Sequence, residues 1–164
     1  MEAFLEEPDA EINLRILVVC TGNIHRSPFA QAMLRKALDE AGLEDIAVES
    51  AGLEAMEGEP VPSEAQAEAL AWGVELSGHR ARQVTRDLVQ DADLILTMDT
   101  YHSTALTTAF PAHRDKVNAL SIFDPEGGPD EIQDPAGTDD ETLRRVYARI
   151  SLCAAEVASY YASP

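Results

Sequence analysis

The chain has 164 residues but only two cysteines and two lysines, and each shortage excludes a class of protein. Cys20 and Cys153 lie far apart, which argues against a disulfide framework. The four histidines are scattered, with no Cys or His pairs at the spacing of a structural zinc site, so we expect no metal and no cofactor. The formal net charge is −18. Because a phosphate backbone requires clustered Lys and Arg, nucleic acid is not an expected partner.

Long apolar runs are missing as well. No run approaches the roughly 18 residues of a membrane span, and residues 1–13 are acidic, without the basic and apolar regions of a secretory signal. We therefore expect a cytoplasmic protein with no membrane partner, built as a flexible acidic tail over 1–13 and one domain over 14–164. The acidic, lysine-poor surface fits a salt-rich cell interior, and equally an ordinary acidic protein.

Short apolar runs alternate with helical patterns along the rest of the chain. Strands are predicted over 15–20, 46–50, 94–98 and 117–122, and helices over about 27–42, 63–72, 99–109, shortly after 85 and from 138 onward. This alternation predicts a single α/β domain with a four-stranded parallel sheet and helices on both faces. Ligands bind beyond the carboxyl ends of such strands, where Cys20, Ser50 and Asp99 fall.

The segment from Cys20 to Ser27, CTGNIHRS, connects the first strand to the first helix. A lone cysteine at a strand end is ordinarily a core residue, but the neighbours of Cys20 suit an anion. Gly22 allows a tight turn that points successive N–H groups inward, and the helix N-terminus adds positive potential. Arg26 offers a planar fork for two phosphate oxygens, and this field favours a thiolate. The segment therefore predicts a phosphate-binding loop with Cys20 as nucleophile.

The loop resembles that of the low-molecular-weight protein tyrosine phosphatase family, approximately V-C-x-G-N-x-C-R-S-P. Residues 19–28 match it at every fixed position except His25. The resemblance extends from about Arg15 to Tyr161 in the same order and spacing, through Ser50-Ala51-Gly52, His79-x-Ala81-Arg82, residues 94–99 and Asp134-Pro135. It implies a four-stranded parallel sheet flanked by helices and a phosphomonoester hydrolase, with phosphorylated protein or a small aryl phosphate as substrate and inorganic phosphate or another oxyanion in the site.

The resemblance also implies a role for each matching residue. Cys20 attacks phosphorus and forms a phosphocysteine, while Arg26 and the loop amides hold the equatorial oxygens. Ser27 steadies the thiolate, and a polar network supports the strained loop. That network comprises Asn23, Ser50 and His79, and the residues expected around the substrate are Thr21, Gly22, Asn23, Ile24, His25 and Ser27.

The general acid is expected in the acidic loop from Phe123 to Gly137. This loop offers four carboxylates, namely Asp124, Asp130, Glu131 and Asp134, and both Asp124 and Asp134 precede a proline. The distance of Asp134 from the C-terminal helix matches the family, so Asp134 is the predicted acid, together with Cys20 and Arg26 as catalytic residues.

Three departures from the family pattern bear on the substrate. His25 replaces a second loop thiol, Met56 stands where relatives often carry an aromatic residue, and Ala136-Gly137 replaces an aromatic pair. A substrate pocket whose entrance has few aromatic residues offers less stacking for a phosphotyrosine ring. The apolar loop residue Ile24, however, suits a ring better than a guanidinium. Phosphotyrosine on protein is the leading expectation, with other phosphoesters left open.

Two other functions remain as alternatives. Arsenate reductases share this loop and fold, but they need further thiols to carry the oxidised state away from the nucleophile. Cys153 is predicted on the apolar face of the last helix and so does not suit that role. A non-catalytic module that binds phosphorylated partners is the other alternative, and it is disfavoured because both the nucleophile and the acid are present.

Overall fold

The computed structural model describes residues 14–163, and in this part of the chain four parallel strands form one sheet. They are β1 (Leu14–Cys20), β2 (Ile46–Gly52), β3 (Leu94–Thr97) and β4 (Val117–Ala119), in the order β2-β1-β3-β4. The predicted single α/β domain with a four-stranded parallel sheet is confirmed. The predicted acidic tail over 1–13 lies outside the described residues.

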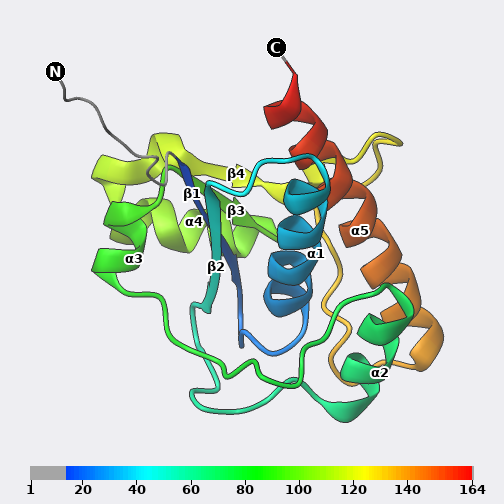
Figure 1. The fold of residues 1–164 in the computed structure, drawn as a ribbon. Coiled ribbons are helices and arrows are strands. Elements are labelled where there is room, and N and C mark those ends of the chain that lie inside the picture. Colours follow the sequence, from blue (N-terminus) through cyan, green and yellow to red (C-terminus); the bar gives the residue numbers. More distant parts are fainter. Residues whose placement is uncertain (1–13, 164) are drawn as a thin grey trace, which may run out of the picture.

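Helices cover both faces of the sheet (Figure 1). One face packs on α1 (Arg26–Glu40) and α5 (Asp140–Ala162), with α2 (Ser63–Ala71) against α5. The other face packs on α3 (Arg86–Asp91) and α4 (Thr100–Ala109). Residues of β1 alternate between the two cores, because successive side chains of a strand point to opposite faces: Ile16 and Val18 join the first, Leu17 and Val19 the second. The apolar run of β1 thus holds both layers together.

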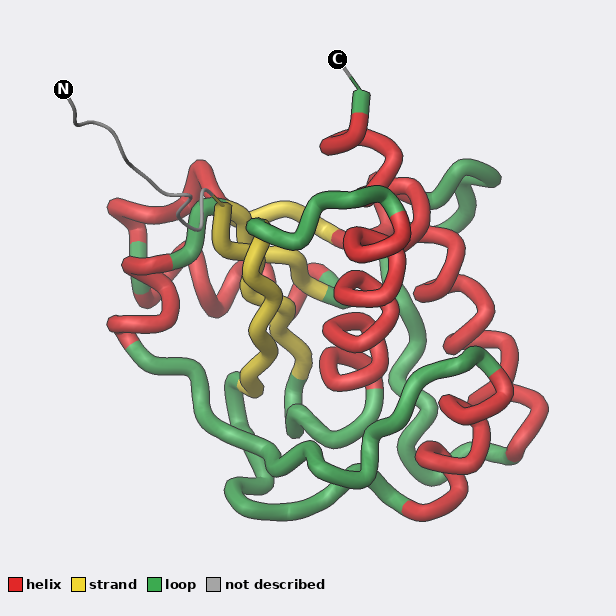
Figure 2. The backbone as a smooth tube through the Cα atoms, in the orientation of Figure 1, coloured by secondary structure: helices red, strands yellow, loops and turns green. Residues whose placement is uncertain are grey.

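Loops gather at the carboxyl ends of the strands, along the lower edge in Figure 2. Two of them are brought to that edge by β1 and β2, which pair in register with Cys20 opposite Gly52. The loop after β1 leads into α1, and the loop after β2 leads into α2. This edge is where the sequence predicts the phosphate-binding loop.

Some element boundaries differ from the sequence-based expectation. The fourth strand ends at Ala119 rather than 122, because β4 pairs only with β3 and the last partner, Thr97, lies opposite Ala119; a 3₁₀ helix, η3 (Leu120–Phe123), follows. A second 3₁₀ helix, η2 (Pro111–Lys116), precedes β4. The last helix begins at Asp140 rather than at 138, since the Asp139 carboxylate accepts from the Thr142 amide at 2.9 Å and caps it.

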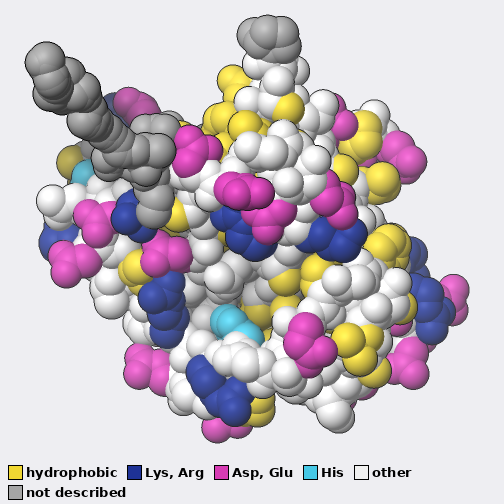
Figure 3. Space-filling view, viewed as in Figure 1, with side chains coloured by type: hydrophobic (Ala, Val, Ile, Leu, Met, Phe, Trp, Pro, Cys, Tyr) yellow, Lys and Arg dark blue, Asp and Glu magenta, His cyan; other side chains and the backbone are white. Residues whose placement is uncertain are grey.

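Charged side chains are spread over the molecular face in Figure 3, with Lys and Arg lying among Asp and Glu rather than gathered in one patch. Two helical ion pairs on α1 illustrate this, Arg35–Asp39 at 2.8 Å and Lys36–Glu40 at 2.9 Å. Exposed pairs of this kind contribute only about 0.3–0.5 kcal/mol each, so the fold rests on its two apolar cores. Between residues 14 and 163 there is no helix of the length and apolarity needed to cross a membrane.

Candidate active site

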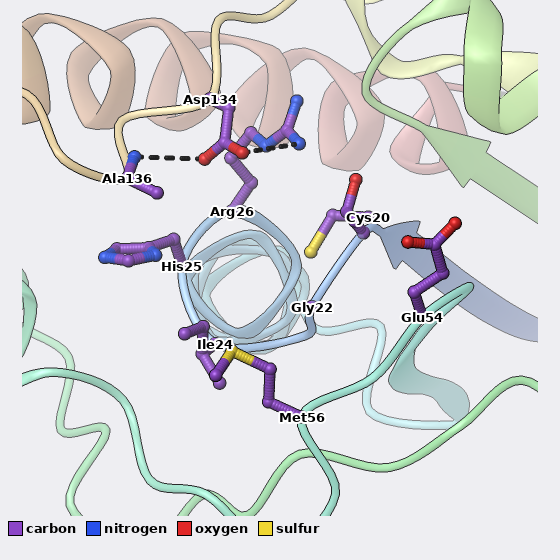
Figure 4. A pocket seen from close by; sticks show the side chains of 10 residues that line it. Cys20, Gly22, Ile24, His25, Arg26, Glu54, Met56, Asp134 and Ala136 are labelled. Atoms are coloured by element: carbon purple, nitrogen blue, oxygen red, sulfur yellow. Dashed lines mark hydrogen bonds and ion pairs between the residues drawn. The ribbon is translucent and has the colours of Figure 1, made fainter.

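The loop from Cys20 to Arg26 forms the floor of a pocket of about 180 Å³ at the carboxyl edge of the sheet (Figure 4). Cys20 ends β1 and is 2% exposed. Its Sγ lies 2.9 Å from the Oγ of Ser27, in the first turn of α1. The thiol therefore meets a hydroxyl and the N-terminus of a 15-residue helix at once, both of which stabilise negative charge on sulfur. The pocket is lined by Cys20, Thr21, Gly22, Ile24, His25, Arg26, Glu54, Met56, Asp134 and Ala136.

Arg26 closes the loop and is only 3% exposed. Its Nη1 donates to the carbonyl oxygen of Ile132 at 2.8 Å and lies 3.4 Å from an oxygen of Asp99. Its Nη2 lies 3.7 Å from an oxygen of Asp134. Two segments, the acidic loop and the N-terminal cap of α4, thus hold the guanidinium beside the pocket. A buried cation fixed in this way can bind an oxyanion with little reorganisation.

Asn23, rather than Gly22, makes the sharp turn of the loop. Asn23 has φ 62°, in the left-handed region, whereas the expectation placed the tight turn at Gly22. Asn tolerates this region better than most residues because its side chain can bond to nearby polar groups. Here Nδ2 donates to the Oγ atoms of Ser27 at 2.8 Å and Ser50 at 3.1 Å. The strained backbone is therefore held by side-chain bonds to α1, through Ser27, and to β2, through Ser50.

The other side of Asn23 is bonded to the segment that precedes α3. The Nε2 of His79 donates to the Asn23 carbonyl at 2.8 Å, and the amide of Arg82 donates to Asn23 Oδ1 at 2.9 Å. Burial lowers the pKa of His79, aided by Arg82 and Arg80 and opposed by the bond to Asn23, so the ring is neutral with its proton on Nε2. The structure thus brings both Ser50 and His79 to the loop.

His25 lies at the mouth of the pocket, just before α1. In Figure 4 its ring extends away from the Cys20 sulfur, toward the side of the pocket where Ala136 lies. Burial lowers the pKa of His25, with a smaller contribution from Arg26, against the opposing effects of Asp134 and Glu64. The ring is therefore neutral at neutral pH and adds no charge to the field around the thiol.

The four candidate acids occupy different places. Asp134 lines the pocket, is 51% exposed, and accepts a hydrogen bond from the Ala136 amide at 3.0 Å. Asp124 points away into an ion pair with Arg149 at 2.7 Å, and Glu131 accepts from the Thr100 hydroxyl at 2.6 Å. Asp130 contributes its backbone carbonyl to Ser121. Of these carboxylates, Asp134 is the one in the pocket lining.

Two polar residues of the site carried no signal in the sequence analysis. Gln31 accepts from the Ser50 hydroxyl at 2.6 Å, and His102 contacts the Thr21 hydroxyl at 2.9 Å. Position i+4 from Ser27 places Gln31 on the same face of α1, and position i+3 from the helix cap Asp99 places His102 in the first turn of α4. These offsets place the two residues on the appropriate helix faces, but they do not predict the contacts with Ser50 and Thr21.

Cys153 lies within α5 and is completely buried. Burial, with a further contribution from Asp124 against that of Arg149, raises the pKa of this thiol to about 12. Cys153 is therefore a protonated core residue. Among residues 14–163, no group of three or more His, Cys, Asp or Glu side chains is arranged to hold a metal ion.

Comparison with known proteins places this geometry in one family. Residues 15–159 match the family model for low molecular weight phosphotyrosine protein phosphatase. The chain is 41% identical over 132 residues to the low molecular weight protein-tyrosine-phosphatase Wzb of Escherichia coli K12, which covers 80% of this chain and 84% of that protein.

Solved structures agree. The tyrosine phosphatase Wzb of Escherichia coli K30, in complex with sulphate, has a TM-score of 0.81 and 30% identity over 90% of this chain and 97% of that one. The YwlE arginine phosphatase of Geobacillus stearothermophilus has a TM-score of 0.80 and 30% identity over 90% and 92%. With the cysteine loop, its helix and the facing aspartate already in view, these matches show that the chain belongs to the low molecular weight phosphotyrosine protein phosphatase family.

Proposed function

We propose that this protein is a phosphomonoester hydrolase that works through a phosphocysteine at Cys20, with phosphotyrosine on protein as its leading substrate. The observation that carries the proposal is the position of Cys20 Sγ, 2.9 Å from Ser27 Oγ on the pocket floor, between the helix N-terminus and buried Arg26. A reducing cytoplasm, which is the expected compartment, would keep this thiol available.

In the first step the Cys20 thiolate attacks phosphorus and the bond from phosphorus to the leaving oxygen breaks. The loop amides and Arg26 hold the equatorial oxygens, where the charge of the transition state lies. Asp134 donates its proton to the leaving oxygen, for which its exposed position in the pocket lining is suited. The products are the free alcohol or phenol and a phosphocysteine.

In the second step Asp134, now a carboxylate, takes a proton from water as that water attacks phosphorus. The sulfur–phosphorus bond breaks, inorganic phosphate leaves, and the Cys20 thiolate is restored. The Ser27 hydroxyl lowers the cost of this departure by donating to the sulfur, since its Oγ is already at hydrogen-bond distance.

The side chains around the pocket mouth favour an aromatic leaving group. Ile24 and Met56 contribute apolar atoms to the wall of the pocket. Glu54 also lines the pocket, and its carboxylate already accepts a hydrogen bond from the Tyr101 hydroxyl at 2.9 Å. An apolar wall favours a phenyl ring over a guanidinium, which must keep its hydrogen bonds when it leaves water. This distinction matters because both tyrosine and arginine phosphatases share the fold.

The proposal is tested by comparing rates on an aryl phosphate, a phosphotyrosine peptide and a phosphoarginine peptide of the same sequence. We expect the first two to be hydrolysed and the phosphoarginine peptide to have a kcat/KM lower by about tenfold or more, because apolar pockets discriminate by one to two orders of magnitude. A preference for phosphoarginine would overturn the substrate assignment but not the reaction. Reduction of arsenate, measured beside these assays, would instead favour the reductase alternative.

His25 in place of a loop thiol predicts an unusual response to oxidation. In relatives a thiol at this position can capture an oxidised nucleophile as a reversible disulfide, which histidine cannot do, so a Cys20 sulfenate is open to irreversible oxidation. We expect peroxide inactivation to become unrecoverable by dithiothreitol sooner in the natural protein than in His25→Cys, compared at equal loss of activity. Equal recovery in the two proteins would contradict this expectation and would point to protection by another group.

A further inference from the structure

His102 is a buried titratable residue that the mechanism above does not use. It lies in the first turn of α4 with no exposed surface, yet it belongs to neither the phosphate-binding loop nor the acidic loop. Its Nε2 is 2.9 Å from the hydroxyl oxygen of Thr21, the residue that directly follows the nucleophile and lines the pocket. A residue remote in sequence therefore contacts the loop at the position next to the nucleophile.

The backbone around His102 determines which ring nitrogen carries the proton. The amide of Met98 donates to Nδ1 at 3.3 Å. Nδ1 also lies 3.2 Å from Asp99 Oδ1, but that oxygen accepts its hydrogen bond from the His102 amide, so Nδ1 is the acceptor for Met98 and the neutral ring is protonated on Nε2. Burial lowers the pKa of His102, aided by Arg26 and opposed by Asp99, Asp134 and Glu131, which keeps the ring neutral. Nε2–H is thus the donor to Thr21, and the hydroxyl proton of Thr21 is left for another acceptor.

The same turn of α4 also contacts the far end of the loop. One oxygen of Asp99 accepts from the His102 amide at 3.0 Å and caps the helix, while the other lies 3.4 Å from Arg26 Nη1. Thr21 and Arg26 border the loop on either side. The first turn of α4 therefore fixes both ends of the loop relative to one another.

We propose that His102 is a positioning residue for the phosphatase reaction: its Nε2–H holds the Thr21 hydroxyl oxygen so that the Thr21 hydroxyl proton is donated into the pocket, to a phosphate oxygen. The expected effect of His102 on catalysis rests on the proposed function. Its expected effect on phosphate affinity rests only on the binding of an oxyanion in the pocket. The rigid imidazole is suited to the task because it orders the threonine without entering the pocket itself. Holding the donor in advance removes part of the reorganisation that binding would otherwise require.

The test is a double-mutant cycle of His102→Ala and Thr21→Val, read as kcat/KM on p-nitrophenyl phosphate and as the Kd of inorganic phosphate. We expect each variant to lose about tenfold in kcat/KM, and the double variant to lose no more than either single one, because residues in contact are not additive. His102→Gln, which keeps an N–H donor, should recover most of the loss. Phosphate affinity should follow the same pattern, and it stays measurable even if turnover is absent, so a failure of the proposed reaction is distinguishable from a failure of this role.

Ser103→Ala supplies the matched control. Its Oγ lies 2.8 Å from Thr97 Oγ1, so it also loses a hydrogen bond between α4 and β3, but one without contact to the loop. We expect a lower Tm with unchanged kcat/KM. Losses that multiply in the double variant, or His102→Gln no better than His102→Ala, would overturn the proposal and leave His102 with a purely structural part.

Discussion

Cys20→Ser loses turnover on every phosphoester while it keeps the fold and the affinity for phosphate. The expected loss is about three orders of magnitude or more, as when the nucleophile of a covalent mechanism is removed. A serine hydroxyl fits beside Ser27 and leaves the loop amides and Arg26 in place, so the binding of an oxyanion does not depend on the sulfur.

The measurement is kcat on p-nitrophenyl phosphate together with the Kd of inorganic phosphate and the Tm. Cys153→Ala is the matched control, since it removes the other thiol, which is buried within α5 and is not part of the pocket lining. That control should turn over normally. A Cys20→Ser protein that retained a tenth of the activity would show that the nucleophile lies elsewhere.

Asp134→Asn should slow the reaction more as the pKa of the leaving group rises, because a more basic leaving oxygen depends more on protonation. We expect a loss of about a hundredfold on phenyl phosphate and a much smaller loss on p-nitrophenyl phosphate, because general acid catalysis contributes most to poor leaving groups. Asp134 is suited to this because its carboxylate lies in the pocket lining and is held by the Ala136 amide at 3.0 Å.

Asp124→Asn is the contrasting variant from the same loop. Burial alone would raise the pKa of Asp124, but hydrogen bonds from Arg149 and the Glu126 amide outweigh it and lower the pKa below the ordinary value. A carboxyl that stays ionised is a poor proton donor. Its loss should instead lower the free energy of unfolding by about 1.5–3 kcal/mol, the value of a hydrogen bond to a charged group.

The two variants are compared as a slope of log kcat against leaving-group pKa and as a Tm. Asp134→Asn should steepen the slope and leave the Tm nearly unchanged, whereas Asp124→Asn should lower the Tm and leave the slope alone. The reverse pattern would make Asp124 the acid and would exclude the assignment of Asp134.

The fold and the phosphate-binding loop could be predicted because their signals are local. The apolar run before Cys20, the Ser27-Pro28 start of α1 and the alternation of strands and helices each depend on neighbours within a few residues. Such features lead to the correct sheet, and they place Cys20 and Arg26 on one loop. The boundaries of β4 and α5 were wrong by a few residues, because strand pairing and side-chain caps decide where elements stop.

What only the tertiary structure decided is which distant groups meet the loop. The residue types alone offered four carboxylates in one acidic loop, among which the family resemblance favoured Asp134. The structure pairs Asp124 with Arg149 on α5 and places Asp134 in the pocket lining. Sequence also assigned the tight turn to Gly22, whereas bonds from Ser50, His79 and Arg82 let Asn23 adopt the left-handed conformation. Contacts such as that of His102 with Thr21, 81 positions apart, form only when parallel strands bring their carboxyl ends to one edge, and no local pattern encodes them.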